Sequence, residues 1–276
     1  MAGGNWPRLE HLDLSSNRLN AGAITQLTQY AWTWRLLDLE VHDNPDMDVI
    51  AVQKLASGRL LFLRGLGISG GFMLNWFIEE VASAWTRLQS VYLDCDYCPA
   101  HDISFAGVWP KLKNLQIKTR EPSRRGILAK PVRLELSEAE WPNLQSLDLS
   151  YSHLDSAGFS QLALGEWPLL SRLDVSHLPF SEDKFKPEHY AVFALGSWPR
   201  LTDLCLSHNG MDDECAAKLI SADWPKLRIL DLSYNDIGAT GSASVAQGKW
   251  PDMEHLCLHG NNLECMCPCC ILQEGF

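Results

Sequence analysis

Aspartates recur at fixed intervals in this sequence, and carboxylates are groups that can perform acid–base chemistry or bind metals. Leu-Asp-Leu-Ser segments contain Asp13, Asp148 and Asp231, and closely similar segments contain Asp38 and Asp174. If these segments pair as parallel strands about 4.8 Å apart, neighbouring carboxylates lie close together. Nothing in the pattern pairs the aspartates with a fixed histidine or with a nucleophile in a catalytic constellation. We therefore interpret the aspartates as a solvated repeat consensus and predict no catalytic residue.

The nine cysteines are the second candidate for chemistry. Cys95 and Cys98 form a C-x-x-C motif, which is half of a zinc site, but no second pair follows at a suitable spacing. The Cys265–Cys270 cluster leaves open a metal or redox tail, a lipidation site, a frayed end or out-of-frame translation. Phosphate-binding glycine loops, G-x-S-x-G and H-E-x-x-H are absent from the sequence. We predict a protein that is not an enzyme and that has no metal and no cofactor.

The elements that position these residues follow from an internal repeat. Trp-Pro occurs seven times and opens the frame W-P-x-L-x-x-L-x-L, and Trp85 opens a further copy without the proline. The complete copies begin at Trp6, Trp109, Trp141, Trp167, Trp198, Trp224 and Trp250. Two worn copies, centred on Leu37 and Leu61, bring the total to ten units with a period near 26 residues. Such a period is typical of a solenoid.

Each unit combines a strand with a helix. Leucines two residues apart, such as Leu230 and Leu232, point to one face of a strand. An asparagine follows in four units, where its amide can bond backbone groups of adjacent turns. Apolar residues spaced by four then indicate helices of about two turns within the segments GAITQLTQYA, GFSQLALGEW and ECAAKLISADW.

These features resemble the leucine-rich repeat proteins, and most closely their ribonuclease-inhibitor-type subclass. Leu9, Leu12, Leu14, Asn17 and Leu19 carry the match in the first unit, and 227–245 carry it in the ninth. The resemblance implies an α/β solenoid shaped like a horseshoe, with a parallel sheet on its concave face and short helices on its convex face. We assign residues 1–264 to this domain and 265–276 to a cysteine-rich tail.

Units two to five depart from the frame. Counting from the same leucine, the asparagine position reads His42, Leu66, Asp96 and Arg120. We therefore expect a bend or a looser stack in the middle of the solenoid.

The resemblance implies a scaffold for protein–protein interaction with a protein partner on the concave face. The outward-facing strand positions that we assign to partner binding are Asp13, Asp38, Phe62, Arg64, Tyr92, Lys118, Asp148, Arg172, Asp174 and Asp231. The alternative is a regulator of an enzyme, either a GTPase-activating protein or a ubiquitin-ligase substrate receptor. The oligomeric state is left open.

Net charge and hydropathy exclude some classes of binding partner. The chain has 276 residues with 23 Lys+Arg and 34 Asp+Glu, which gives a formal net charge of −11. This balance argues against binding to nucleic acid or to anionic lipid. Because the sequence has no run of about 18 apolar residues and no recognisable signal peptide, we expect no membrane association and a cytoplasmic protein with reduced thiols.

Overall fold

The computed structural model describes residues 6–97, 103–106, 108–119, 134–136, 139–152, 154–178 and 186–263. Within these residues one parallel sheet has the strand order β1-β2-β3-β4-β6-β8-β9-β10-β11-β12. Its strands are β1 (His11–Asp13), β2 (Asp38–Val41), β3 (Gly65–Met73), β4 (Ser90–Tyr97), β6 (Asn114–Thr119), β8 (Ser146–Asp148), β9 (Arg172–Asp174), β10 (Asp203–Cys205), β11 (Ile229–Asp231) and β12 (His255–Cys257). A separate pair joins β5 (Ile103–Ser104) to β7 (Leu134–Glu135).

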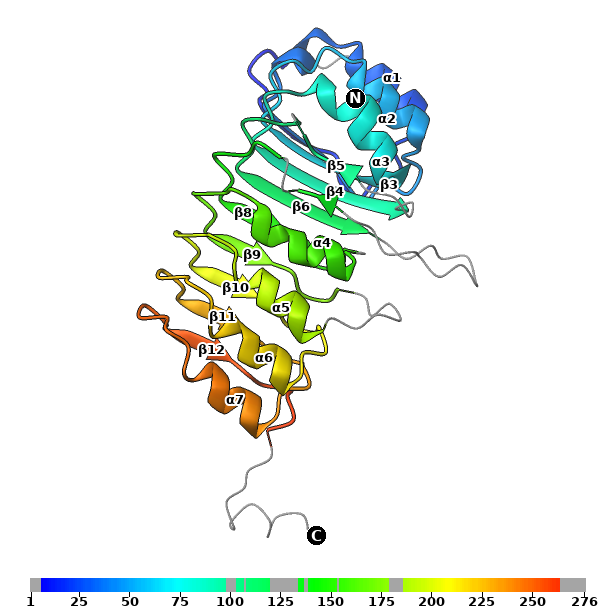
Figure 1. Ribbon diagram of the computed structural model, residues 1–276. Coiled ribbons are helices and arrows are strands. Elements are labelled where there is room, and N and C mark those ends of the chain that lie inside the picture. Colours follow the sequence, from blue (N-terminus) through cyan, green and yellow to red (C-terminus); the bar gives the residue numbers. More distant parts are fainter. Residues whose placement is uncertain are drawn as a thin grey trace, which may run out of the picture.

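Helices alternate with the strands and cover one face of the sheet, and the first and last repeats lie at opposite ends of the molecule (Figure 1). The α-helices are α1 (Ala21–Thr28), α2 (Val49–Ala56), α3 (Leu74–Trp76), α4 (Ser156–Gln161), α5 (Pro187–Phe193), α6 (Asp213–Leu219) and α7 (Ala239–Val245). The 3₁₀-helices are η1 (Ala31–Arg35), η3 (Ala82–Ala84) and η4 (Leu162–Leu164), and η2 (Phe77–Val81) is a π-helix. The other face of the sheet, which we call the open sheet face, is the predicted concave face.

The short helices begin at side-chain caps. Asn20, Asp48, Asp155 and Asp212 each accept a hydrogen bond from the backbone N–H three residues later, at the first turns of α1, α2, α4 and α6. Such caps satisfy an N–H group that has no partner inside the helix. The helices predicted around GAITQLTQYA, GFSQLALGEW and ECAAKLISADW are confirmed as α1, α4 and α6.

Leucines and tryptophans fill the space between the sheet and the helices. The strand leucines, such as Leu147, Leu173 and Leu204, are buried and lie side by side on neighbouring strands. The tryptophans of the repeat frame form a second row, in which Trp141 stacks on Trp167 with ring centroids 6.5 Å apart. Because no repeat can bury these side chains alone, the stack of repeats forms one continuous core.

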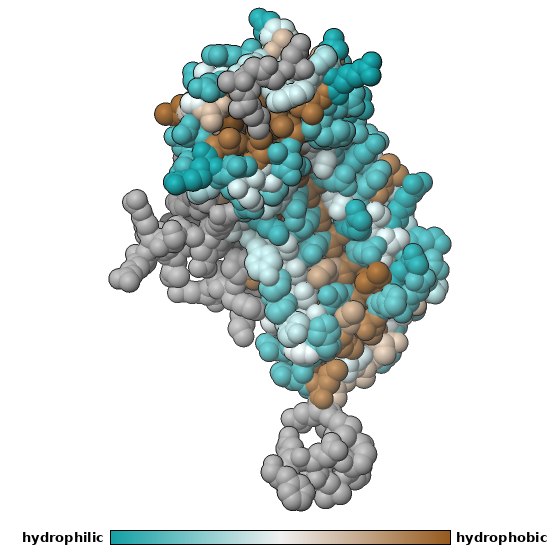
Figure 2. Space-filling model, turned by 180° about the vertical axis from the view of Figure 1, so that it is seen from behind, coloured by the Kyte–Doolittle hydropathy of each residue, from teal (hydrophilic) through white to brown (hydrophobic). Residues whose placement is uncertain are grey.

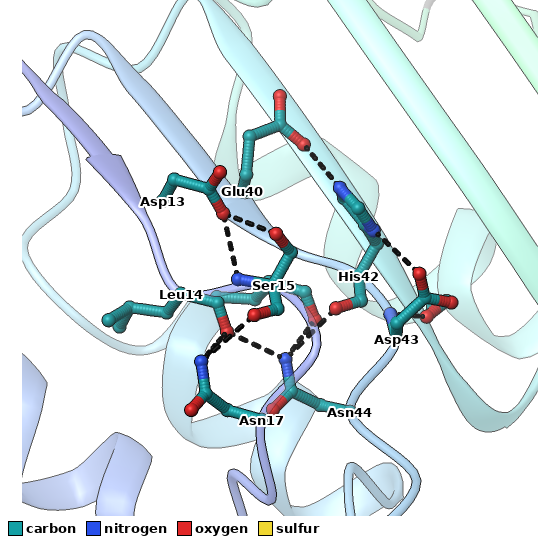
Figure 3. Close-up of polar contacts among 10 residues, drawn as sticks. Asp13, Leu14, Ser15, Asn17, Glu40, His42, Asp43 and Asn44 are labelled. Atoms are coloured by element: carbon teal, nitrogen blue, oxygen red, sulfur yellow. Dashed lines mark hydrogen bonds and ion pairs between the residues drawn. The ribbon is translucent and has the colours of Figure 1, made fainter.

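The strand register corrects the prediction for units two and three. Leu12 pairs with Leu39, and Leu39 pairs with Leu66, so the equivalent residues are not Leu37 and Leu61. The asparagine of unit two is therefore Asn44, not the expected His42. Asn44 is buried; its amide donates to the carbonyls of Leu14, Val41 and His42, and its oxygen accepts the N–H of Leu19 (Figure 3).

The middle of the sheet has longer strands in three of the five units that lack the asparagine, whereas the units of β8 and β9, with Ser152 and Leu178 at that position, keep short strands. Strands β3, β4 and β6 have nine, eight and six residues, whereas the strands from β8 to β12 have three each. A longer ladder satisfies backbone groups that an asparagine would otherwise bond. The sheet is continuous through this region, and its register shifts between Gly70 and Met73. The strands of this region are paired over more residues than the later ones, so they do not form the looser stack that was expected. Arg120 and residues 264–276 lie outside the described residues.

Candidate functional site

Rows of equivalent side chains run across the open sheet face. The central row consists of the residue after each register leucine: Asp13, Glu40, Gly67, Tyr92, Gln116, Asp148, Asp174, Cys205, Asp231 and Cys257. Asp38 was predicted to lie in this row, but the structure places it one position earlier, where it pairs with His11. Lys118 lies on the same face further along β6.

The aspartates of the central row bond the backbone that follows them. One carboxylate oxygen, Oδ1, of Asp13, Asp148, Asp174 and Asp231 accepts the N–H of the serine two residues later, at 2.8–2.9 Å. These bonds turn the chain at the end of each strand and fix the orientation of the carboxylate. The repeated Leu-Asp-Leu-Ser motif thus has a structural role, as the interpretation of a repeat consensus requires.

A hollow of about 360 Å³ lies on the open sheet face over strands β8 to β11. Its polar lining includes the predicted residues Asp148, Arg172, Asp174 and Asp231, and the structure adds Asp203 and Cys205. Four of the ten predicted partner-binding residues are thus brought together around one concavity, which contains four carboxylates and one guanidinium group.

Burial changes the chemistry of two groups in the hollow. It raises the pKa of the Asp174 carboxyl, the hydroxyl and N–H of Ser176 oppose this rise, and the charge of Asp148 adds to it. Burial also raises the pKa of the Cys205 thiol. Cys205 Sγ lies 3.7 Å from Asp231 Oδ2, to which it donates. A protonated thiol is a poor nucleophile, so this cysteine acts as a small hydrogen-bond donor.

A ridge of stacked rings borders the C-terminal ends of these strands. Tyr151 stacks on His177 with centroids 4.2 Å apart, His177 stacks on His208 at 3.9 Å, and His208 stacks on Tyr234 at 4.4 Å. We call these four residues the ring ridge. Tyr151 and Tyr234 are 51% and 52% exposed, and Lys118 Nζ lies 5.7 Å from the centroid of the Tyr151 ring.

The backbone sets the spacing of the ring ridge. Each of its residues has a positive φ between 52° and 57°, and each donates its N–H to the serine or histidine carbonyl of the next repeat. The repeats therefore hold successive rings about one strand spacing apart, which suits stacking. Ser16 and Asp43 have the same positive φ, so the geometry belongs to the repeat. The choice of rings is particular to these four units.

Reading the sequence missed the ring ridge although its signal is visible there. The four consecutive copies LDLSY, LDVSH, LCLSH and LDLSY all end in tyrosine or histidine. Comparing the copies column by column would have revealed this position.

In the N-terminal half of the open sheet face, carboxylates lie beside histidines. Asp38 Oδ2 lies 2.7 Å from His11 Nδ1. The two nitrogens of His42 lie 3.9 Å from Glu40 and 3.3 Å from Asp43 (Figure 3). His42 also contacts the predicted Tyr92 edge to face, with centroids 5.7 Å apart.

Glycines in β3 make room for these carboxylates. A Cβ atom added at Gly65 would overlap Asp38, and one added at Gly67 would overlap Glu40. Neither Phe62 nor Arg64 lies in β3 as the prediction required, because the strand begins at Gly65. Phe62 lies in the turn before it, with Arg87 5.3 Å from its ring centroid.

The arrangement over β8–β11 offers carboxylates and a guanidinium group to a ligand. In the described part of the chain no three His, Cys, Asp or Glu side chains are grouped so that they could hold a metal ion. Among the described helices, none is both long and apolar enough to span a bilayer.

The view from behind shows a largely hydrophilic surface with a hydrophobic area near the N-terminal end and a hydrophobic band along the lower repeats (Figure 2).

Comparisons with known proteins identify the repeat. Residues 8–28 and 225–246 match models described as leucine-rich repeat. No curated protein sequence matches the chain. A solved structure of the mouse RP105/MD-1 complex is similar, with a TM-score of 0.54 and 17% identity over 96% of this chain and 41% of that one. A Bacteroides fragilis protein is similar with a TM-score of 0.51 and 14% identity, over 89% of this chain and 71% of that one.

These findings confirm an α/β leucine-rich repeat solenoid. The chain spans about two-fifths of the length of the RP105/MD-1 structure that it matches. At these identities the similarity shows the fold alone.

Proposed function

We propose that this leucine-rich repeat solenoid is a non-enzymatic module that binds a protein partner on the open sheet face over β8–β11. The observation that carries the proposal is the ring ridge. Two of its tyrosines expose about half of their surface beside a hollow, although stacked rings could instead have been buried in the core.

Interface chemistry supports this assignment. Tyrosine is enriched at the centres of protein interfaces, because it provides a large rigid contact area together with a hydroxyl group. Leucine-rich repeat domains are generally interaction scaffolds, and the similar RP105/MD-1 structure is, by its name, a complex. Of the predicted site residues, Lys118, Asp148, Arg172, Asp174 and Asp231 lie on or beside this surface. Asp13, Asp38, Phe62, Arg64 and Tyr92 lie in the N-terminal half and are not part of this proposal.

Site-specific photocrosslinking tests the proposal. A benzoylphenylalanine at position 234 should form a discrete adduct with a protein in cells that express the chain. The same group at position 195, where Leu195 is 74% exposed after α5, is the control on the helical side. Adducts of equal yield at both positions, or none at position 234, would contradict binding on the open sheet face.

The finer assignments stay predictions. The ribonuclease-inhibitor-type subclass, a cytoplasmic location and a role as regulator of a GTPase or a ubiquitin ligase are part of the hypothesis from the sequence, and no contact in the hollow favours the regulator role. Identification of the crosslinked protein would test that role, and imaging of the tagged chain would test the location.

A further inference from the structure

We propose that the partner segment recognised over β8–β11 is an extended chain that carries arginine side chains. The inference rests on the proposed function and adds the chemistry of the partner. Its basis is the combination of the ring ridge with the carboxylates of the hollow.

Charge complementarity is the first argument. The hollow contains four carboxylates, Asp148, Asp174, Asp203 and Asp231, against the single guanidinium group of Arg172. A ligand that neutralises this surplus must be cationic. An acidic peptide or a nucleic acid phosphate would instead be repelled.

The fixed orientation of the carboxylates is the second argument. Asp148, Asp174 and Asp231 are each held by the serine N–H that their Oδ1 atoms accept. Side chains that are already ordered lose little conformational freedom on binding. Carboxylates on neighbouring strands about 4.8 Å apart suit a guanidinium group, whose five N–H donors form a rigid planar fork, better than a single ammonium group.

The ring ridge provides the third argument. The ring faces stack on one another, so the ridge presents mainly ring edges and the polar atoms of the tyrosines and histidines. The methylene stem of an arginine can pack along such a ridge while its head reaches the carboxylates. Ridge and hollow are electrostatically coupled, because the charge of Asp174 acts on the His177 imidazole. Lys118 already places a cation above the terminal Tyr151 ring.

Fluorescence anisotropy with a labelled extended peptide, in which arginines are separated by glycine and serine, tests the inference. Peptides in which lysine or glutamate replaces arginine are the probes of selectivity. We expect the arginine peptide to bind most tightly, the lysine peptide more weakly and the glutamate peptide not at all. Binding should weaken as the salt concentration rises, because the interacting charges are partly exposed.

A matched pair of variants locates the binding. Asp174→Asn combined with Asp231→Asn should weaken arginine-peptide binding by at least about tenfold, the effect of losing one charge-assisted hydrogen bond. Asp13→Asn changes the same repeat position in β1 and should leave binding unchanged. An asparagine oxygen can still accept the serine N–H, so the turns remain, and a melting curve of each variant verifies the fold.

Equal binding of the arginine and lysine peptides would overturn the inference, as would wild-type affinity in the double variant or an equal loss in Asp13→Asn. If the photocrosslink at position 234 still forms in any of these cases, the proposed function stands with a partner of different chemistry. If that crosslink is absent while the arginine peptide binds as expected, the hollow recognises arginine and the proposed cellular function fails.

Discussion

The two halves of the open sheet face use the same repeat motif but differ in what their charged groups contact. Over β1–β3 the carboxylates are paired with histidines, as in Asp38 with His11 and Glu40 with His42, and two of them fold over glycines of β3. Over β8–β11 the carboxylates surround a hollow beside the ring ridge. The carboxylates of the second half also accept hydrogen bonds within the fold, as Asp148 does from Gln116 and Asp231 from Cys205, but they surround a hollow instead of lying beside histidines.

The comparison teaches that the repeat provides positions, and that the residues at those positions decide between scaffold and recognition. The equivalent position after the strand holds Ser16 or Asp43 in the first two units and Tyr151 or His177 in later units, and φ is nearly the same in all four. The backbone geometry alone therefore does not mark a binding site. The rings and their exposure do.

The largest expected effect separates an interior repeat of the C-terminal half from the first repeat of the N-terminal half by stability. Asn235 is buried; it donates to the carbonyls of Leu206 and Leu232 and accepts the N–H of Met211. Asn235→Ala leaves these backbone groups unpaired and should lower the free energy of unfolding by about 3–4 kcal/mol. Asn17→Ala, in the exposed first unit, removes bonds to carbonyls of its own turn and should cost about 1 kcal/mol or less.

Urea unfolding of both variants measures this difference. Equal losses would mean that the asparagines contribute through the local turn alone and not through the bonds between repeats. That result would remove the physical basis for treating the C-terminal repeats as a rigid platform.

The second effect concerns the glycines that shape the N-terminal half. Gly70 has φ of 155°, and an added Cβ would overlap the backbone carbonyl of Met47, so Gly70→Ala should cost about 2–3 kcal/mol. Gly67→Ala meets only the flexible end of Glu40, which can move aside, so it should cost less than about 1 kcal/mol.

Thermal unfolding of the two alanine variants provides the measurement. If Gly67→Ala lowers the stability as much as Gly70→Ala does, the Glu40 carboxylate cannot move away from its position over Gly67 of β3. The N-terminal half would then be more rigidly filled than its contacts suggest.

Much of the fold could be predicted because the Trp-Pro frame fixes strand, turn and helix in most units. The register errors occur in the units that have lost the Trp-Pro frame. Near Leu36, Leu37 and Leu39 several leucines offer alternative registers, and the prediction chose Leu37. Counting back five residues from Asn44 would have selected Leu39. In the third unit the glycines of β3 replace the polar residues that mark the outward face, so the pattern itself is lost.

The candidate site could be predicted only in part. Asp148, Asp174 and Asp231 follow from the repeat motif, and Arg172 follows from its position before a register leucine. The hollow depends on how the side chains of four strands lie relative to one another, which spacing along the chain does not encode. The ring ridge depends on stacking between layers, and it becomes visible only when equivalent positions of successive repeats are compared.

The smallest expected effect is a pH dependence that belongs to the C-terminal half. Burial lowers the pKa of the His177 imidazole, the charge of His208 lowers it further, and Asp174 opposes both. The unfolded chain therefore takes up this proton more readily, so stability falls as the pH drops below about 6.5 and through the folded-state pKa. Because the ring is partly exposed, the contribution should stay below about 1 kcal/mol, and the melting temperature should shift by less than about 4 °C.

His177→Phe keeps a ring in the stack and removes the proton, so its melting temperature should fall less than that of the wild type between pH 7.5 and pH 5.5. His42→Gln removes a histidine from the N-terminal half, so it should keep the part of the acid-induced fall in melting temperature that His177 causes. If His177→Phe loses as much stability in acid as the wild type, the stacked histidines do not couple the ridge to pH. Recognition over β8–β11 would then respond to acid only through its carboxylates.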